Sequence, residues 1–309
     1  MRILVAGAGA VGGYFGGRLA EKGEDVTFLL RPVRQSLINA QGLTIKSAHG
    51  DIQIPVNTIN RNDARVPFDL IIVSSKAYQL NGIVDDITAY VGPASKILPL
   101  LNGYAHYELL AGKFGKDKIL GGLCFIESTL GPGGEILQTS PQHRITFGSF
   151  TGNNELEEQI ADHLKGANFE LNLSNEIMRE IWIKYTYITC LSGMTSLMQA
   201  PLGMIREDKW GWKVYQQLVN EVIDIASKAG FPADEDCKAK LLNLVRTNHP
   251  GLKSSMQRDM EKGLPVEADH LHGYLLHLAS KAGADLIYDY PLLSTVYANL
   301  NIYQNQINK

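Results

Sequence analysis

The chain opens with an apolar run that leads directly into a glycine-rich turn and then into a helical pattern. Arg2–Ala6 predicts a buried strand, and Val11–Lys22 has the apolar spacing of a helix that ends at Gly23. The turn between them reads Gly7-Ala8-Gly9-Ala10-Val11-Gly12. The order of strand, G-x-G-x-x-G turn and helix is the one that a dinucleotide site requires.

The rest of the first half alternates between strand and helix patterns. Strands are predicted over Asp25–Leu30, Phe68–Ser74, Ser95–Leu101, Ile119–Glu127 and Phe169–Leu173, and helices over Leu80–Tyr90 and Glu155–Ala167. Gly42–Ser47 and Asp51–Val56 are predicted to form a hairpin around His49-Gly50. Continuous apolar strands that alternate with helices indicate an α/β fold with a doubly wound, Rossmann-type parallel sheet.

A turn of Gly131-Pro132-Gly133-Gly134 interrupts this alternation. The segments around it, Phe125–Leu130, Glu135–Thr139 and Arg144–Gly148, are predicted as short antiparallel strands appended to the parallel sheet.

Beyond Ser174-Asn175 the pattern is entirely helical. Helices are predicted over Glu176–Leu197, Trp210–Ala229, Ala233–Leu244, Ser254–Met260, His270–Ala282 and Tyr290–Asn305. Because single cores rarely grow past ~250–300 residues, a chain of 309 residues is expected to form two domains. We predict a Rossmann-type domain over residues 1–173 and an all-helical domain over residues 174–309.

Charge and cysteine usage narrow the possible partners. A net charge of −3 and a pI near 6.2 argue against binding to nucleic acid or an anionic membrane. No segment approaches the ~18 continuous apolar residues of a membrane span. Cys124, Cys190 and Cys237 lie far apart without metal-ligand spacing, so we expect buried thiols, no metal site and a cytoplasmic location.

The end of the second strand distinguishes NAD from NADP. An acidic residue at this place binds the ribose 2′-hydroxyl, whereas an arginine accommodates a 2′-phosphate. Here the strand runs into Arg31, with Arg34 close behind, and no acid occupies the ribose position. We therefore predict NADP(H), and the alternative is that Arg31 is a solvated surface residue.

Two further polar positions follow buried strands. Lys76 comes after Ser74-Ser75, and Asn102-Gly103 ends the next strand along the chain. Ligands of open α/β sheets bind at the carboxyl ends of strands, so both residues are candidates for cofactor or substrate contacts. The alternative is that they are plain loop residues.

These residues, together with several farther along, resemble the ketopantoate reductases (2-dehydropantoate 2-reductases) over nearly the whole chain. The matching elements are Gly7-x-Gly9-x-x-Gly12, Arg31, Lys76, Asn102-Gly103 with Glu108, Trp182-x-Lys184, Ser254-Ser255-Met256 with Asp259, and Glu267-x-Asp269 before His272-Gly273. The resemblance implies a Rossmann domain followed by a helical domain like that of 6-phosphogluconate dehydrogenase.

The resemblance also implies roles for individual residues. Lys184 would be the general acid for the keto oxygen, and Glu267 would position this lysine and the substrate hydroxyl. Asn102 would contact cofactor and substrate, Ser255 the substrate carboxylate, and Lys76 would lie at the cofactor end. An ammonium group suits this chemistry, because hydride addition to a 2-oxo acid leaves charge on an alkoxide.

Each of these residues also has a simpler interpretation. Lys184 would face water on its helix and pair with Glu180 at i,i+4. Glu267 would only favour a helix start, and Ser254-Ser255 would be an ordinary helix cap.

The chain departs from the family at positions that usually carry asparagine. Ile188 and Ser192 stand where two asparagines follow the lysine, and Leu202 and Leu252 replace two others. The position before Gly273 is His272. Hydroxyls of Ser192, Thr189 and Thr195 are candidate replacements for the missing amides.

The resemblance and the departures from it imply three hypotheses for the function. The first is NADPH-dependent reduction of 2-dehydropantoate to pantoate in pantothenate biosynthesis. The second is reduction of a different, more apolar 2-oxo acid on the same scaffold, and the third is a non-catalytic NADPH-binding sensor. The aromatic-rich helical domain is also consistent with a homodimer.

Overall fold

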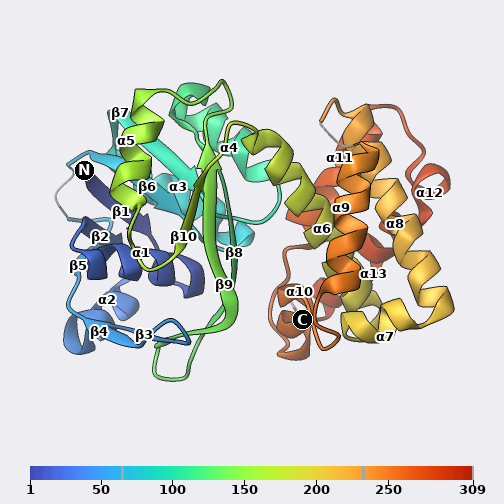
Figure 1. Ribbon diagram of the computed structural model, residues 1–309, viewed down its shortest axis with the longest axis horizontal. Coiled ribbons are helices and arrows are strands. Elements are labelled where there is room, and N and C mark those ends of the chain that lie inside the picture. Colours follow the sequence, from blue (N-terminus) through green and yellow to red (C-terminus); the bar gives the residue numbers. More distant parts are fainter. Residues whose placement is uncertain (64–65, 232–233, 308–309) are drawn as a thin grey trace. The chain divides into compact units, whose positions relative to one another are not determined.

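The chain divides into two compact units (Figure 1). The computed structural model describes residues 1–63, 66–231 and 234–307. One unit comprises Met1–Leu101 and His106–Ile177, and the other comprises Asn102–Ala105 and Met178–Lys309. The division after Ile177 lies close to the predicted boundary at Leu173–Asn175. The grouping of Asn102–Ala105 with the helices was not predicted.

A five-stranded parallel sheet forms the centre of the first unit. Its strand order is β5-β2-β1-β6-β7, the arrangement of a doubly wound nucleotide-binding fold. The strands are β1 (Arg2–Ala6), β2 (Asp25–Leu29), β5 (Asn57–Ile59), β6 (Phe68–Val73) and β7 (Val91–Pro99). The predicted Rossmann-type fold is confirmed, although β5 was not predicted.

The strands outside this sheet form a second sheet. It has the order β10-β9-β3-β4, with β8 paired to β9. Its strands are β3 (Leu43–Ser47), β4 (Ile52–Ile54), β8 (Gly121–Leu130), β9 (Ile136–Gly148) and β10 (Glu170–Leu173). The predicted hairpin is present as β3 and β4, and β8 and β9 are antiparallel as expected. Two of the predicted short strands are joined as β9, and the link to the parallel sheet is a bridge between Ile97 and Ile119.

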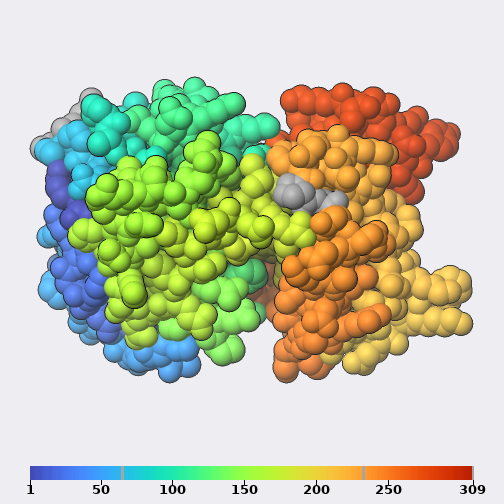
Figure 2. All heavy atoms as spheres, turned by 45° about the horizontal axis from the view of Figure 1, so that its top comes forward, coloured from blue at the N-terminus to red at the C-terminus, as the bar shows by residue number. Residues whose placement is uncertain are grey.

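The first helix, α1 (Ala10–Lys22), packs between the two sheets. A Cβ on Gly16 would lie 2.8 Å from Phe28 and Val5 of the parallel sheet, and one on Gly17 would lie 2.7 Å from Ile45 of the second sheet. Glycine therefore lets both sheets approach the helix. The remaining helices of this unit are α2 (Pro32–Gln41), η1 (Ala77–Gln79), α3 (Leu80–Ile87), η2 (Thr88–Tyr90), α4 (Ala105–Phe114), η3 (Lys116–Lys118) and α5 (Glu155–Leu164). On the face shown in Figure 2, the yellow-green residues that include α5 cover much of this unit.

The second unit is helical, as predicted. Its elements are α6 (Ile177–Met198), α7 (Leu202–Glu207), α8 (Lys209–Lys228), α9 (Glu235–Thr247), α10 (Ser255–Glu261), η4 (Asp269–Gly273), α11 (Tyr274–Lys281), α12 (Leu286–Asp289) and α13 (Pro291–Ile307). Helix α9 was predicted to start at Ala233, which lies outside the described residues. The predicted helix His270–Ala282 begins as a π-helical turn, η4, and continues as α11.

The three cysteines are all buried, in agreement with the sequence-based expectation. Across residues 1–63, 66–231 and 234–307, no cluster of three or more histidine, cysteine or acidic side chains is placed to hold a metal ion. The helices in that part of the chain are all too short or too polar to cross a membrane.

Candidate active site

The glycine turn lies at the carboxyl edge of the parallel sheet. Gly7 has φ +94°, a conformation that favours glycine, and its N–H donates to the Leu29 carbonyl at 3.0 Å. A Cβ on Gly12 would lie 2.1 Å from Ser74 Oγ and 2.7 Å from the Gly7 carbonyl oxygen. Only glycine therefore allows α1 to start this close to β1 and β6.

The start of α1 fits the pyrophosphate of a dinucleotide. Gly9 is the N-cap and has no side chain to satisfy the first N–H groups of the helix, and a Cβ there would meet no atom within 4 Å. Ala10 and Val11 form the first turn, whose N–H groups have no partner within the helix. Ala8 is buried and anchors the turn in the core.

Ala6 is in register with both Leu29 and Val73, so β1, β2 and β6 end at the same edge of the sheet. Polar residues follow β2 and β6 at this edge. Arg31 is exposed and is the N-cap residue of α2. Ser74 and Ser75 follow β6, and their hydroxyl oxygens are buried without a partner in the described part of the chain. Lys76 comes next, half-buried, and precedes η1.

Arg34 also reaches the glycine turn, from the first turns of α2. Its Nε donates to the Ala8 carbonyl at 3.2 Å, and its Nη1 donates to the Gly134 carbonyl at 2.7 Å. Burial lowers the pKa of Arg34, but a guanidinium remains protonated at neutral pH. Sequence reasoning noted this arginine only as a neighbour of Arg31.

In the helical unit, the segment Asn102–Ala105 packs against η4. The Asn102 carbonyl oxygen and His270 Nε2 are 2.9 Å apart, which indicates an N–H donated by the imidazole. Gly103 has φ +90°, and a Cβ there would lie 2.9 Å from Leu271 and 3.0 Å from His270. The ring of Tyr104 packs against Trp182, with centroids 5.1 Å apart.

Lys184 lies on α6 between buried aromatic residues. Its exposure is 7%, so it does not lie on a solvated helix face, and Trp182 and Tyr185 beside it are 1% exposed. The Tyr185 hydroxyl donates to the Leu271 carbonyl at 2.5 Å, and burial raises its pKa. This hydrogen bond holds η4 against the turn of α6 that carries Lys184.

Glu267 is half-buried and lies two residues before the π-helical turn, and its carbonyl oxygen accepts the Leu271 N–H at 3.1 Å. Burial lowers the pKa of His270, while the negative charge of Glu267 and the contact with Asn102 oppose that shift. The negative charge of the Glu267 carboxylate therefore influences His270, which lies in the turn that contacts Asn102. Rare π-helical turns occur frequently at functional sites.

The two serines of the Ser-Ser pair differ in structure. Ser254 is the N-cap of α10, since its Oγ accepts the Gln257 N–H at 3.0 Å, and it is also 2.8 Å from Thr195 Oγ1. The cap interpretation is therefore correct for Ser254. Ser255, the predicted carboxylate ligand, is exposed in the first turn of α10.

The positions that depart from the family follow Lys184 along α6. Ile188 is half-buried, and the Ser192 hydroxyl, 2% exposed, donates to the Thr189 carbonyl at 3.3 Å. Leu202 is fully buried in the core of the helical unit. His272 is also fully buried, with Nε2 at 3.0 Å from the Thr189 carbonyl oxygen.

His270 was not identified from the sequence, because its contact with Asn102 joins segments that are distant in the chain. The signal that was available is its place directly after Glu267-x-Asp269. Within the helical unit, the structure thus brings Asn102, Lys184 and the turn after Glu267 into one region.

A Rossmann-type unit with a G-x-G-x-x-G turn places the protein among the dinucleotide-binding proteins, and its helical unit buries a lysine. Residues 3–152 match the family model for ketopantoate reductase PanE/ApbA, and residues 176–304 match the model for its C-terminal part. The chain therefore belongs to the ketopantoate reductase family, and it is an oxidoreductase of this kind that uses a nicotinamide cofactor.

Individual relatives are similar over almost the whole chain. A Bacillus subtilis (strain 168) protein named uncharacterized oxidoreductase YkpB is 41% identical, over 98% of this chain and 99% of its own. The crystal structure of 2-dehydropantoate 2-reductase from Geobacter metallireducens GS-15 is 29% identical with a TM-score of 0.86, over 98% of this chain and 99% of that one. D-mandelate dehydrogenase, solved with NADH and anilino(oxo)acetate, shares the fold at 20% identity, with a TM-score of 0.88 and coverage of 100% and 99%.

Proposed function

We propose that the protein reduces 2-dehydropantoate to pantoate with NADPH, a step of pantothenate biosynthesis. The observation that carries the proposal is the burial of Lys184 on α6, next to the η4 turn that contacts Asn102. The relatives that are named 2-dehydropantoate 2-reductase support this substrate. The exposed Arg31 after β2, with no acid at the ribose position, supports NADPH as the cofactor.

In this mechanism the nicotinamide, when bound, supplies the hydride. Lys184 donates a hydrogen bond to the keto oxygen and transfers its proton as negative charge develops there. Glu267 holds the lysine and the substrate hydroxyl, Ser255 binds the carboxylate, and Asn102 orients the reacting groups. Burial of the lysine strengthens its interaction with the developing charge, since the local dielectric is low.

A second candidate substrate is another 2-oxo acid with an apolar side chain. It is favoured by the residues that follow Lys184 on α6, namely Ile188, Ser192 and Thr195. Ile188 offers no hydrogen bond, and the Ser192 hydroxyl donates to its own helix. The Thr195 hydroxyl is also engaged, at 2.8 Å from both the Leu191 carbonyl oxygen and Ser254 Oγ. Of the three candidate hydroxyls, only that of Thr189 has no hydrogen-bond partner within residues 1–63, 66–231 and 234–307, and Thr189 is fully buried.

A matched pair of acids separates the two candidates. The compound 3,3-dimethyl-2-oxobutanoate differs from 2-dehydropantoate only in lacking the terminal hydroxyl. NADPH consumption is followed by absorbance with each acid, and kcat/KM is compared. A site built to bind a substrate hydroxyl rejects the analogue that lacks it by about 10⁴-fold, and this result would support 2-dehydropantoate.

The other outcomes are equally informative. Equal or better turnover of 3,3-dimethyl-2-oxobutanoate, which lacks the hydroxyl, would favour the apolar candidate. Tight NADPH binding without turnover of either acid, or of a wider panel of 2-oxo acids, would leave the sensor hypothesis.

A further inference from the structure

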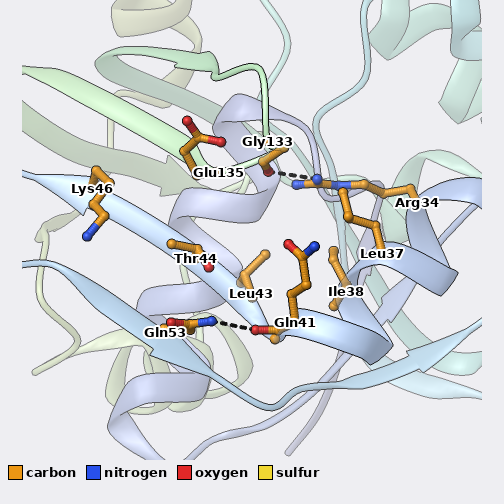
Figure 3. A pocket seen from close by; sticks show the side chains of 12 residues that line it. Arg34, Leu37, Ile38, Gln41, Leu43, Thr44, Lys46, Gln53, Gly133 and Glu135 are labelled. Atoms are coloured by element: carbon orange, nitrogen blue, oxygen red, sulfur yellow. Dashed lines mark hydrogen bonds between the residues drawn. The ribbon is translucent and has the colours of Figure 1, made fainter.

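The Arg34 guanidinium connects two glycine-rich turns that are far apart in the sequence. Its Nε donates to the Ala8 carbonyl in the G-x-G-x-x-G turn. Its Nη1 donates to the Gly134 carbonyl in the turn that connects β8 to β9. Figure 3 shows Arg34 extending from α2 toward the turn that contains Gly133, with a hydrogen bond across the gap. The proposed reaction assigns no role to either contact.

The first contact fixes the orientation of one peptide group in the cofactor turn. A trans peptide is planar, so the Ala8 C=O and the Gly9 N–H point in opposite directions. An arginine that holds the Ala8 oxygen therefore turns the Gly9 N–H away from itself. The space around Gly9 is open, since a Cβ there would meet no atom within 4 Å.

We propose that Arg34 is a positioning residue for the cofactor: it holds the Ala8–Gly9 peptide so that the Gly9 N–H is presented to the pyrophosphate. Its fixed positive charge beside the turn also favours an anion there. The inference rests on dinucleotide binding and on no particular oxo acid.

The second contact explains the glycines between β8 and β9. Gly134 has φ +84°, and a Cβ there would lie 2.6 Å from Arg34 Nη1 and 2.5 Å from Leu37. Only glycine at this position lets the arginine reach both carbonyls. The turn is itself closed by hydrogen bonds from Gly134 N to the Gly131 carbonyl and from Gly131 N to the Glu135 carbonyl, at 3.0 and 2.8 Å.

Arg34 and Arg31 have different roles in this proposal. Two donors of Arg34 are engaged by backbone carbonyls, whereas Arg31 is exposed and available to a 2′-phosphate. Arg34 should therefore act on every dinucleotide alike, and Arg31 should discriminate between NADPH and NADH.

Truncation of Arg34 should leave a folded protein. Arg34, Gly133 and Glu135 line a cavity of about 340 Å³ (Figure 3). Because both Arg34 and Gly134 border this cavity, water can reach the Gly134 carbonyl once the guanidinium is removed. Gly134→Ala gives a second, independent way to disturb the same contact.

The test measures dissociation constants of Arg34→Ala, Arg34→Lys and Arg31→Ala by calorimetry for NADPH, NADH and adenosine 2′-monophosphate, which has no pyrophosphate. Loss of hydrogen bonds from a charged group typically changes a dissociation constant by about 10- to 100-fold. We therefore expect Arg34→Ala to weaken the binding of NADPH and of NADH by the same factor within this range. Binding of adenosine 2′-monophosphate should be unchanged. Arg34→Lys should recover part of the loss, and Gly134→Ala should reproduce it.

Two outcomes would overturn the proposal, and a third would bear on the cofactor preference alone. A much larger loss for NADPH than for NADH would make Arg34 a 2′-phosphate ligand. Unchanged affinities for both dinucleotides, in Arg34→Ala or, if that variant does not fold, in Gly134→Ala, would make the contact purely structural. Failure of Arg31→Ala to discriminate between the cofactors would contradict NADPH preference and leave the role of Arg34 intact.

Discussion

Substitution of Gly103 tests whether the segment Asn102–Ala105 is held tightly in the helical unit. In Gly103→Ala, a residue with a side chain must adopt φ +90°, and its Cβ must fit 2.9 Å from Leu271 and 3.0 Å from His270. Gly283→Ala is a matched control in the same unit, because Gly283 has φ +84° and a Cβ there would meet nothing within 4 Å.

The two variants differ in steric crowding and share the backbone strain. A left-handed conformation costs an L-residue about 1–2 kcal/mol, so Gly283→Ala should lose about that much stability. Crowding in a packed site typically costs about 1–3 kcal/mol more, so Gly103→Ala should lose about 2–5 kcal/mol. Movement of Asn102 and His270 by about 1 Å should lower kcat/KM by up to about 100-fold.

Urea unfolding followed by tryptophan fluorescence measures the loss of stability in each variant. The three tryptophans, Trp182, Trp210 and Trp212, all belong to the helical unit, so their emission reports on that unit alone. Steady-state assays with NADPH and the preferred oxo acid give kcat/KM. Equal destabilisation of the two variants, with equal activity, would refute the tight packing of Gly103 against η4.

Three further predictions concern single side chains. Because Lys184 acts as a general acid, Lys184→Ala should lower kcat by at least about 10²-fold in steady-state assays and leave the NADPH affinity measured by calorimetry unchanged. Lys281→Ala, which removes an exposed lysine, is the control. A similar loss of kcat in this control would contradict the role of Lys184. Arg31→Ala should weaken NADPH far more than NADH in the same titrations, and an equal effect on both would remove its contact with the 2′-phosphate. Burial lowers the pKa of His272 to about 4, below the value of an unfolded histidine, so its contribution to stability is present at neutral pH and is lost as the pH falls from about 6.5 toward 4. The unfolding free energy of the helical unit, measured by urea titration at each pH, should fall by up to about 3 kcal/mol over this range. The fall should be smaller in His272→Gln.

The parallel sheet was predictable because its strands carry strong local signals. β1 and β6 are nearly continuous apolar runs, and both begin within the predicted limits. Helix α2 was not predicted, since half of the residues of Pro32–Gln41 are polar and the helix buries only Ile38. Its position depends on contacts with other elements, which local periodicity does not record.

The long strand β9 shows a different limit. The pattern around Pro141 breaks, and this break predicted two short strands instead of one. Proline is tolerated at irregular places in a sheet, and the pairing of β8 with β9 does shift register between Ile126 and Ser128. A break in the apolar pattern therefore marked an irregularity within a strand and not its end.

In the candidate site, the glycine turn and Lys184 were identified from short motifs. The contact between His270 and Asn102 was not, because it depends on a π-helical turn and on a segment that precedes the helical unit in sequence. The role of Gly134 was hidden for the same reason, since its neighbour Arg34 lies 100 residues earlier in the chain.

The position of Tyr104 has a consequence for dissecting the molecule. A fragment that starts after Leu173 would contain every long helix of the second unit but would lack this ring, which packs on Trp182, Phe231 and Tyr274 with centroids 5.0 to 6.2 Å apart. Such a fragment would expose an aromatic hollow to solvent. Independent folding of the C-terminal part would therefore need a peptide containing residues 102–105 added in trans or grafted onto its N-terminus.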